Sequence, residues 1–141
     1  MKNGGVLKLT TYYWYSPNGV SIDKTGIEPD VEVFMPDIYY QTYYEMQESE
    51  TYEYDSVANA VLVAQKALDY LGYEVDRTDG YFDSSLAEAL KDYRAGLGME
   101  ESEVLDREIF TSIISETRRE LANNKEKDTQ FQKALEIIRS E

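Results

Sequence analysis

The sequence predicts an α+β fold that is mainly α, with a three-helix domain flanked by N-terminal strands and a C-terminal helix. Residues 6–15 are rich in β-branched and aromatic side chains and alternate apolar with polar ones, which is typical of a strand. Residues 56–121 contain three amphipathic segments whose apolar residues recur every three or four positions, the period of a helix. A fourth segment of this kind covers residues 129–140.

The N-terminal strands are short and few. After the strand at residues 6–15, the Pro and Asn-Gly of residues 16–19 predict a turn, because Pro presets its φ and Asn-Gly tolerates positive φ. Residues 20–22 can return as a partner strand, and residues 31–34 predict a third. Three short strands without a covering helix cannot bury both faces of a sheet. We therefore expect them to form the edge of a larger sheet.

An acidic, tyrosine-rich segment follows at residues 38–55. No Lys or Arg occurs between Lys24 and Lys66, while nine acidic residues occur from Glu28 to Asp55, both included. We interpret the segment as a linker that lies along a neighbouring surface. Its tyrosines could form a stacking platform for sugars or could attach the linker to the protein, and we favour the second interpretation. These tyrosines are Tyr39, Tyr40, Tyr43 and Tyr44.

The first two helices have recognisable ends. Helix one is predicted to follow a cap at Asp55 or Ser56 and to end at Gly72, which can adopt positive φ. Its apolar stripe consists of Val57, Val61, Ala64, Leu68 and Leu71. Helix two is predicted to begin with a capping box between Ser85 and Glu88. The residues it should bury are Leu86, Ala89, Leu90 and Tyr93.

The third helix is predicted to begin at Asp106 and to break at Asn123 and Asn124, before a charged run. A last helix then covers residues 129–140. The apolar face of helix three comprises Ile109, Phe110, Ile113, Ile114, Thr117 and Leu121, and that of the last helix comprises Phe131, Ala134, Leu135 and Ile138.

Composition excludes several classes of function. The net charge is −14 and the pI is near 4.3, so the surface of the chain repels phosphate groups. This argues against nucleic acid and anionic membranes as partners. The absence of His and Cys excludes disulfides, thiolate chemistry, His-dependent triads and ordinary zinc sites. No apolar stretch of about 18 residues could span a membrane. Residues 1–5 lack the apolar core of a signal peptide, so we expect any export signal to lie outside this chain.

The sequence predicts no catalytic residue, metal site or cofactor in this chain. Without His or Cys, nucleophilic catalysis would need Ser or Thr paired with Lys, or a pair of carboxylates. Lys8 lies on the predicted strand opposite Leu7 and Leu9, as an ordinary exposed lysine would. A glycosidase would need two carboxylates in a cleft, and a cleft is not visible in a sequence.

Three aspartates in one loop, Asp76, Asp79 and Asp83, invite a calcium interpretation. An EF-hand loop needs glycine at its sixth position and oxygen ligands at positions one, three and twelve. If Gly80 is the sixth residue, those positions hold Val75, Arg77 and Leu86, which the ligand pattern does not accept. Turn formation and helix capping explain these acids better.

The helical stretch resembles the three-helix peptidoglycan-binding-like domain of bacterial cell-wall proteins. The matching residues are Gln65, Leu68, Leu71-Gly72-Tyr73, Asp79-Gly80-Tyr81-Phe82, Ala89-Leu90, Tyr93, Gly98-Met99 and Val104-Leu105-Asp106. The chain departs from the pattern at Asp83, Arg94 and Glu103, which add charge around the implied ligand groove. The residues that this resemblance assigns to ligand binding are Tyr73, Asp79, Tyr81, Tyr93 and Arg94.

Residues 4–33 are similar to the closing strands of the C-terminal processing, or tail-specific, proteases. The corresponding residues are Gly4-Gly5, Leu7-Lys8-Leu9-Thr10, Ser16-Pro17, Gly19, Ser21-Ile22, Gly26-Ile27 and Pro29-Asp30-Val31. Residues 128–135 also resemble the last helix of such proteases, and some Gram-positive members carry the peptidoglycan-binding-like domain in between. The resemblance thus covers nearly the whole chain.

This resemblance implies a serine endopeptidase that acts on protein or peptide substrates outside the cytoplasm, as a secreted or membrane-anchored enzyme. Such proteases use a Ser-Lys dyad in which the lysine is the general base for the serine. In these proteases both dyad residues and the substrate-gating PDZ domain lie upstream of the matching segment. Lys8 lies in the Leu-Lys-Leu-Thr motif and not at the position of the base.

The resemblance divides the chain into incomplete protease strands (1–37), the acidic linker (38–55), the three-helix domain (56–118) and a protease helix (119–141). We expect the helical domain to act as an accessory, dimerisation or cell-wall-anchoring module of the protease. The alternative is a stand-alone peptidoglycan-binding module without catalysis. We also expect a homodimer, and its interface would use Ile113, Ile114, Leu121, Phe131 and Leu135.

Overall fold

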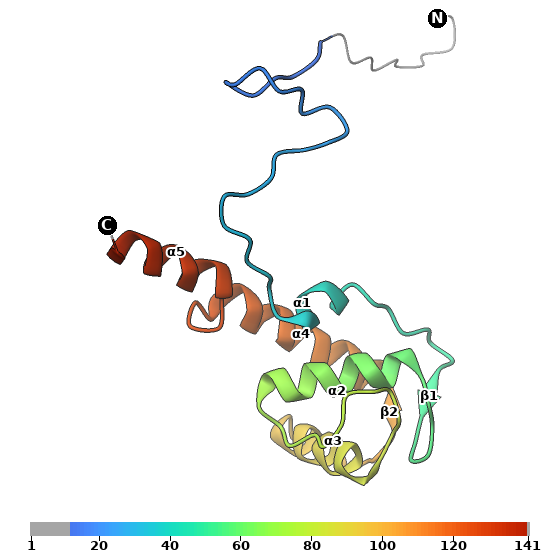
Figure 1. Cartoon of the computed structure of the whole chain (residues 1–141). Coiled ribbons are helices and arrows are strands. Elements are labelled where there is room, and N and C mark those ends of the chain that lie inside the picture. Colours follow the sequence, from blue (N-terminus) through green and yellow to red (C-terminus); the bar gives the residue numbers. More distant parts are fainter. Residues whose placement is uncertain (1–11, 141) are drawn as a thin grey trace, which may run out of the picture. The chain divides into compact units, whose positions relative to one another are not determined.

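The protein is mainly helical, as the sequence predicts. The structure is a computed structural model; it describes residues 12–140 and divides the chain into two units, residues 1–32 and 33–141. All its named helices and strands belong to the second unit (Figure 1). They are α1 (Asp37–Gln41), β1 (Thr51–Tyr52), α2 (Asn59–Leu71), α3 (Ser84–Gly96), β2 (Leu105–Asp106), α4 (Arg107–Asn123) and α5 (Thr129–Ser140).

The described part of the first unit contains the predicted turn. Ser16 N–H donates to the carbonyl of Val20 (2.8 Å), and Gly19, at φ 77°, donates its N–H to the carbonyl of Ser16 (2.9 Å). Tyr15 and Ser21 form an antiparallel bridge, so the chain does return on itself after the turn. The strand predicted at residues 6–15 lies largely outside the described residues, as do Leu7, Lys8 and Leu9.

The prediction of a third strand at residues 31–34 is wrong. These residues pair with no strand among residues 12–140. Instead, the carbonyl of Val33 accepts a hydrogen bond from the Gln130 side chain (3.4 Å), and that of Phe34 accepts one from the Thr129 hydroxyl (2.7 Å). Two of the backbone carbonyls that a sheet would use thus accept hydrogen bonds from the start of α5.

α2 begins later than predicted. Its N-cap is Ala58, which provides no side-chain hydrogen bond, so the cap predicted at Asp55 or Ser56 is wrong. Asp55 instead accepts a hydrogen bond from the Tyr81 hydroxyl (2.9 Å). Val57 consequently lies outside the helix and is 74% exposed rather than part of its apolar stripe. The predicted end is confirmed: Gly72 adopts φ 97°, a left-handed conformation that closes the helix.

The N-termini of α3 and α4 are capped by aspartates. Asp83, not the predicted Ser85, caps α3 by accepting a hydrogen bond from Leu86 N–H (3.0 Å). Ser85 donates its hydroxyl to Asp83 (3.1 Å) and accepts from Asp76 N–H (2.9 Å), so it supports the cap without forming it. Asp106 caps α4 as predicted, through Ile109 N–H (2.9 Å). An N-cap of this kind stabilises a helix by about 1 kcal/mol.

One hydrophobic core joins α2, α3 and α4, which confirms the three-helix domain. Each helix buries most of the face that its periodicity predicts, although Val57 is exposed and Leu71 and Leu121 are only partly buried. Each fully buried Leu, Ile or Phe contributes about 1.5–3 kcal/mol. The largest buried apolar side chains are Leu68 from α2, Leu86, Leu90 and Tyr93 from α3, Ile109, Phe110 and Ile113 from α4, and Phe82 and Leu105 from the connections.

Residues 38–55, expected to form a linker, are packed into the same unit. Ile38 of α1 and Met46 are buried in the core, and the Tyr44 ring lies edge-on to Phe110 with the ring centres 5.8 Å apart. β1 pairs antiparallel with β2, so that Tyr52 lies opposite Leu105. This segment therefore contributes to the folded helical domain.

α5 has the predicted bounds but buries none of its residues. Its amphipathic face therefore has no complete partner within the described chain. No helix among the described residues has the length and apolar character needed to cross a membrane.

Candidate functional site

A polar cluster surrounds Tyr81, in the connection between α2 and α3, and its Asp55, Arg77 and Asp79 are exposed. The Tyr81 hydroxyl donates to the Asp55 carboxylate (2.9 Å), and the Arg77 guanidinium lies 4.6 Å from the centre of the Tyr81 ring. Asp79 accepts hydrogen bonds from Arg77 Nε (3.0 Å) and Tyr81 N–H (3.1 Å). We call Asp55, Arg77, Asp79 and Tyr81 the Tyr81 cluster.

Hydrogen bonds reinforce the charge states that the carboxyl and the phenol of this cluster ordinarily have at neutral pH. The bond from Arg77, with help from Tyr81 N–H, lowers the pKa of Asp79, so this carboxyl stays ionised. The bond to Asp55 raises the pKa of Tyr81, so its hydroxyl stays protonated. At neutral pH the cluster offers an aromatic ring beside fixed carboxylates, which are groups that can stack on and hydrogen-bond a polar ligand.

A buried amide holds the Tyr81 cluster in place. Gln65 of α2 is fully buried; its Nε2 donates to the carbonyl of Tyr81 (2.8 Å) and its Oε1 accepts from Gly80 N–H (2.9 Å). Gly80 has φ 89°, and a Cβ there would lie 3.0 Å from the carbonyl oxygen of Ala58. This role of Gln65 is absent from the sequence prediction, although a polar residue among the buried positions of α2 was its signal.

Tyr73 and Tyr93 form a separate pair. Their ring centres are 5.6 Å apart in an edge-on arrangement. Tyr93 is only 2% exposed, and its hydroxyl shares a hydrogen bond with Ser112 (3.1 Å) and donates to Glu116 (3.0 Å). Burial, with the Glu116 carboxylate, raises the pKa of Tyr93 to about 12. Tyr93 thus joins α3 to α4 inside the domain.

Arg94 is also buried, with 6% of its surface exposed. Its guanidinium donates to the Asp106 carboxylate (2.7 Å) and to the carbonyl of Val104 (3.2 Å). Burial alone would raise the pKa of Asp106, but hydrogen bonds from Ile109 N–H and Arg94 outweigh it and lower that pKa. Arg94 therefore fixes the start of α4.

The five residues expected to bind ligand consequently do not share one surface. Asp79 and Tyr81 lie together in an exposed cluster, Tyr73 packs on the buried Tyr93, and Arg94 is used inside the domain. Of the five, only Asp79 and Tyr81 lie together in one exposed cluster.

The five residues expected at a dimer interface do not share one surface either. Ile113 and Ile114 are buried in the core of the three-helix domain, where a second copy could not reach them. Leu121, Phe131 and Leu135 are partly exposed. The accessible part of this set thus lies mainly on α5.

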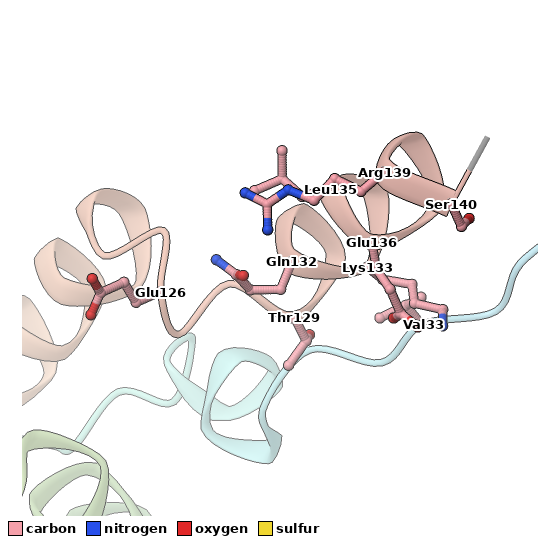
Figure 2. A pocket seen from close by; sticks show the side chains of 9 residues that line it. All are labelled: Val33, Glu126, Thr129, Gln132, Lys133, Leu135, Glu136, Arg139 and Ser140. Atoms are coloured by element: carbon pink, nitrogen blue, oxygen red, sulfur yellow. Dashed lines mark hydrogen bonds and ion pairs between the residues drawn. The ribbon is translucent and has the colours of Figure 1, made fainter.

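α5 borders a hollow of about 640 Å³. Figure 2 shows that Leu135 and Lys133 of α5 line it, with Val33 from the segment that precedes α1. Lys133 pairs with Glu136 (2.8 Å) on the same helix. Within residues 12–140 no group of His, Cys, Asp and Glu side chains is arranged to hold a metal ion.

Comparison with known proteins assigns both parts of the chain. A family described as a putative peptidoglycan binding domain matches residues 57–113, and Peptidase family S41 matches residues 1–33. The carboxy-terminal processing protease CtpA of Bacillus subtilis is 30% identical over 139 residues, 99% of this chain. CtpB of the same organism is 30% identical over 138 residues, and a probable CtpA-like serine protease of Staphylococcus haemolyticus is 29% identical over 118.

The chain belongs to the carboxyl-terminal processing proteases. It corresponds to their C-terminal region and carries a peptidoglycan-binding-like domain. It covers 28% of the length of each Bacillus protease and 23% of the Staphylococcus protein. The peptidoglycan-binding match spans α2 and α3, ends within α4, and includes Asp79 and Tyr81.

Proposed function

We propose that this chain is the C-terminal region of a serine endopeptidase whose Ser-Lys dyad lies upstream of Met1. The observation that carries the proposal is that similarity to two processing proteases extends over both flanks of the helical domain, to 98–99% of the chain. A stand-alone peptidoglycan-binding module would account for residues 57–113 only. The substrate of the parent enzyme would be a protein or peptide, and its location extracytoplasmic.

In this proposal the helical domain has an accessory role. The Tyr81 cluster gives it an exposed surface for a polar ligand, and α5 gives it an apolar face for a second copy. Neither feature supplies a nucleophile with an adjacent base, which peptidase chemistry requires. The domain would therefore anchor, regulate or dimerise the protease rather than cleave.

The test compares the parent protein with this chain alone, using an unstructured fluorogenic peptide. The parent should cleave it, and alanine replacement of the serine in an upstream serine-lysine pair should abolish cleavage. This chain alone should be inactive. Cleavage by the chain alone, or a parent without such a pair, would contradict the proposal. Fractionation of the native host should find the parent outside the cytoplasm.

A second candidate function is peptidoglycan binding, which the exposed Tyr81 cluster within the matched domain supports. The purified chain would sediment with insoluble peptidoglycan, and Tyr81→Ala would reduce the bound fraction several-fold. Tyr12→Ala, at an exposed tyrosine of the other unit, is the matched control. Equal sedimentation of both variants would remove this candidate.

A further inference from the structure

Two pairs of an Asn or Asp followed by Gly lie among residues 12–140, Asn18-Gly19 and Asp79-Gly80. Such a pair is reactive because glycine has no side chain to hinder its backbone nitrogen. That nitrogen can attack the side-chain carbonyl carbon of the preceding residue and close a five-membered succinimide ring. The ring forms only where the nitrogen can leave its hydrogen bond and reach that carbon, so the surroundings of each glycine decide the outcome.

Asn18-Gly19 lies in the turn of residues 16–19, which is open to solvent. Both residues are exposed, and a Cβ at Gly19 would meet no atom within 4 Å apart from its chain neighbours. The Gly19 N–H donates to the carbonyl of Ser16 (2.9 Å) within the same turn. Exposed turns of this kind open locally at little cost in free energy, and water then replaces the bond. The Gly19 nitrogen can therefore be released without unfolding a helix.

The surroundings of Asp79-Gly80 oppose the same reaction. Gly80 is buried, and its N–H donates to Oε1 of the fully buried Gln65 (2.9 Å). A Cβ at Gly80 would lie 3.0 Å from the Ala58 carbonyl oxygen, so the backbone is closely enclosed here. Arg77 Nε donates to both oxygens of the Asp79 carboxylate (3.0 and 3.1 Å), and these bonds lower the pKa of Asp79. Ring closure at a carboxyl group releases water and needs the protonated form, which this pairing disfavours.

We propose that Asn18 is a site of spontaneous modification to aspartate and isoaspartate, whereas the fold protects Asp79. In the first step the Gly19 nitrogen gives up its proton and bonds to Cγ of Asn18, and the Cγ–Nδ2 bond breaks with release of ammonia. Water then opens the succinimide. Breaking the bond from the Gly19 nitrogen to Cγ gives aspartate, and breaking its bond to the backbone carbonyl carbon gives isoaspartate. Water is the only co-reactant.

The isoaspartate product changes the turn, because its backbone runs through the former side chain and is one carbon longer. The hydrogen bond between Ser16 and Gly19 and the bridge between Tyr15 and Ser21 both depend on the original spacing. Either product also adds one negative charge to the turn. The turn lies within the residues that match Peptidase family S41, so the modification alters this part of the chain and not the helical domain. The inference does not depend on the proposed function.

The test incubates the full chain at mildly alkaline pH and follows its tryptic peptides by mass spectrometry and by labelling with an isoaspartyl methyltransferase. Trypsin gives residues 9–24, whose only asparagine is Asn18, and residues 3–8, which keep the Asn3-Gly4 pair separate. Asn18 should react at least tenfold faster than the two asparagines of residues 120–125, which precede residues with side chains. In strong urea the Asn18 rate should change less than tenfold, whereas isomerisation of Asp79 should become at least tenfold faster.

Two variants separate the reactions at the two pairs. Asn18→Gln keeps an amide but would need a six-membered ring, so residues 9–24 should stay unmodified. Gln65→Leu removes the partner of the Gly80 N–H, so it should speed the isomerisation of Asp79 and leave the Asn18 rate unchanged. If Gln65→Leu does not fold, the comparison with urea answers the same question. An Asn18 rate equal to that of the asparagines in residues 120–125, or more than tenfold below its rate in urea, would overturn the proposal. Equal isomerisation of Asp79 with and without urea would overturn its protection.

Discussion

The hydroxyl of Thr129, the first residue of α5, donates a 2.7 Å hydrogen bond to the backbone carbonyl of Phe34. These residues are 95 positions apart, and between them lies the whole helical domain. The peptidase match ends at residue 33, directly before this contact. Since the two ends of the domain meet, it can occupy its place in the chain without separating the segments on either side.

Removing the Thr129 hydroxyl should weaken the contact between the start of α5 and Phe34. Thr129→Val keeps the shape of the side chain but removes the donor, and we expect a loss of about 0.5–1 kcal/mol in unfolding free energy. Hydrogen exchange should become faster at the amides of Phe131 and Gln132, which donate hydrogen bonds in the first turn of α5. Thr129→Ser keeps the hydroxyl and is the control. Unchanged exchange in Thr129→Val would show that other contacts hold the ends together.

Gln65→Leu should destabilise the helical domain much more than Thr129→Val does. The variant leaves Gly80 N–H and the Tyr81 carbonyl without their partner in a buried position. Each unsatisfied buried group costs about 1–3 kcal/mol, so the expected loss is roughly 2–4 kcal/mol in urea unfolding. Gln47→Leu, at an exposed position, should change stability by less than about 0.5 kcal/mol. A similar effect of both variants would contradict the role of Gln65.

Tyr93 should be among the last tyrosines to ionise as the pH rises. Its pKa is about 12 in the folded chain and near 10 in the unfolded chain, so folding favours the protonated form. The associated stability is complete below about pH 10 and is lost as the pH rises toward 12, by about 2–3 kcal/mol. Tyr93→Phe should abolish this part of the alkaline loss. Ultraviolet titration and urea unfolding measure the two effects, and a Tyr93→Phe profile equal to the original would contradict them.

Asp106 links two separate interactions that two variants can distinguish. Asp106→Asn keeps an acceptor for Ile109 N–H but removes the charge beside Arg94, whereas Asp106→Ala removes both. Asp106→Ala should cost about 2–4 kcal/mol, since it leaves a buried arginine without its anion. Asp106→Asn should cost less, because the cap remains.

The acid limb of the stability profile provides the pH test for the same residue. The folded pKa of Asp106 lies below its ordinary value of 3.8, so its contribution is present above that pH. The contribution disappears as the pH falls through the folded value. In Asp106→Asn this part of the acid loss should be missing from urea unfolding curves. An acid limb identical to that of the original chain would contradict the assignment.

Local signals in the sequence predicted the features that depend on few neighbours. Gly72 and Asp106 end and begin their helices as predicted, because the required conformation or acceptor is a property of the residue itself. The α3 cap could not be decided in this way, since Asp83 and Ser85 are both good caps. The backbone N–H of Asp76 occupies the Ser85 hydroxyl and so decides between them.

Features that depend on distant residues could not be predicted from local signals. The five-residue α1 exists because Ile38 packs into a core made by later helices. Periodicity placed Tyr93 on a buried face, but the pairing of its neighbour Arg94 with Asp106 arises from the approach of α3 and α4. The resemblance to the peptidoglycan-binding-like domain therefore assigned Tyr93 and Arg94 to ligand binding, whereas both residues make contacts inside the domain.

Ile138 offers the sharpest test of the proposed dimer. It is 70% exposed on an α5 that buries no residue, and it shares the apolar face with Phe131 and Leu135. Ile138→Glu should therefore leave the melting temperature of the helical domain nearly unchanged. If two copies pair through this face, the new charge should shift the chain from dimer to monomer in light scattering. Ser140→Glu adds the same charge two positions away and should leave the dimer intact. A chain that is monomeric before any substitution would contradict the proposed dimer directly.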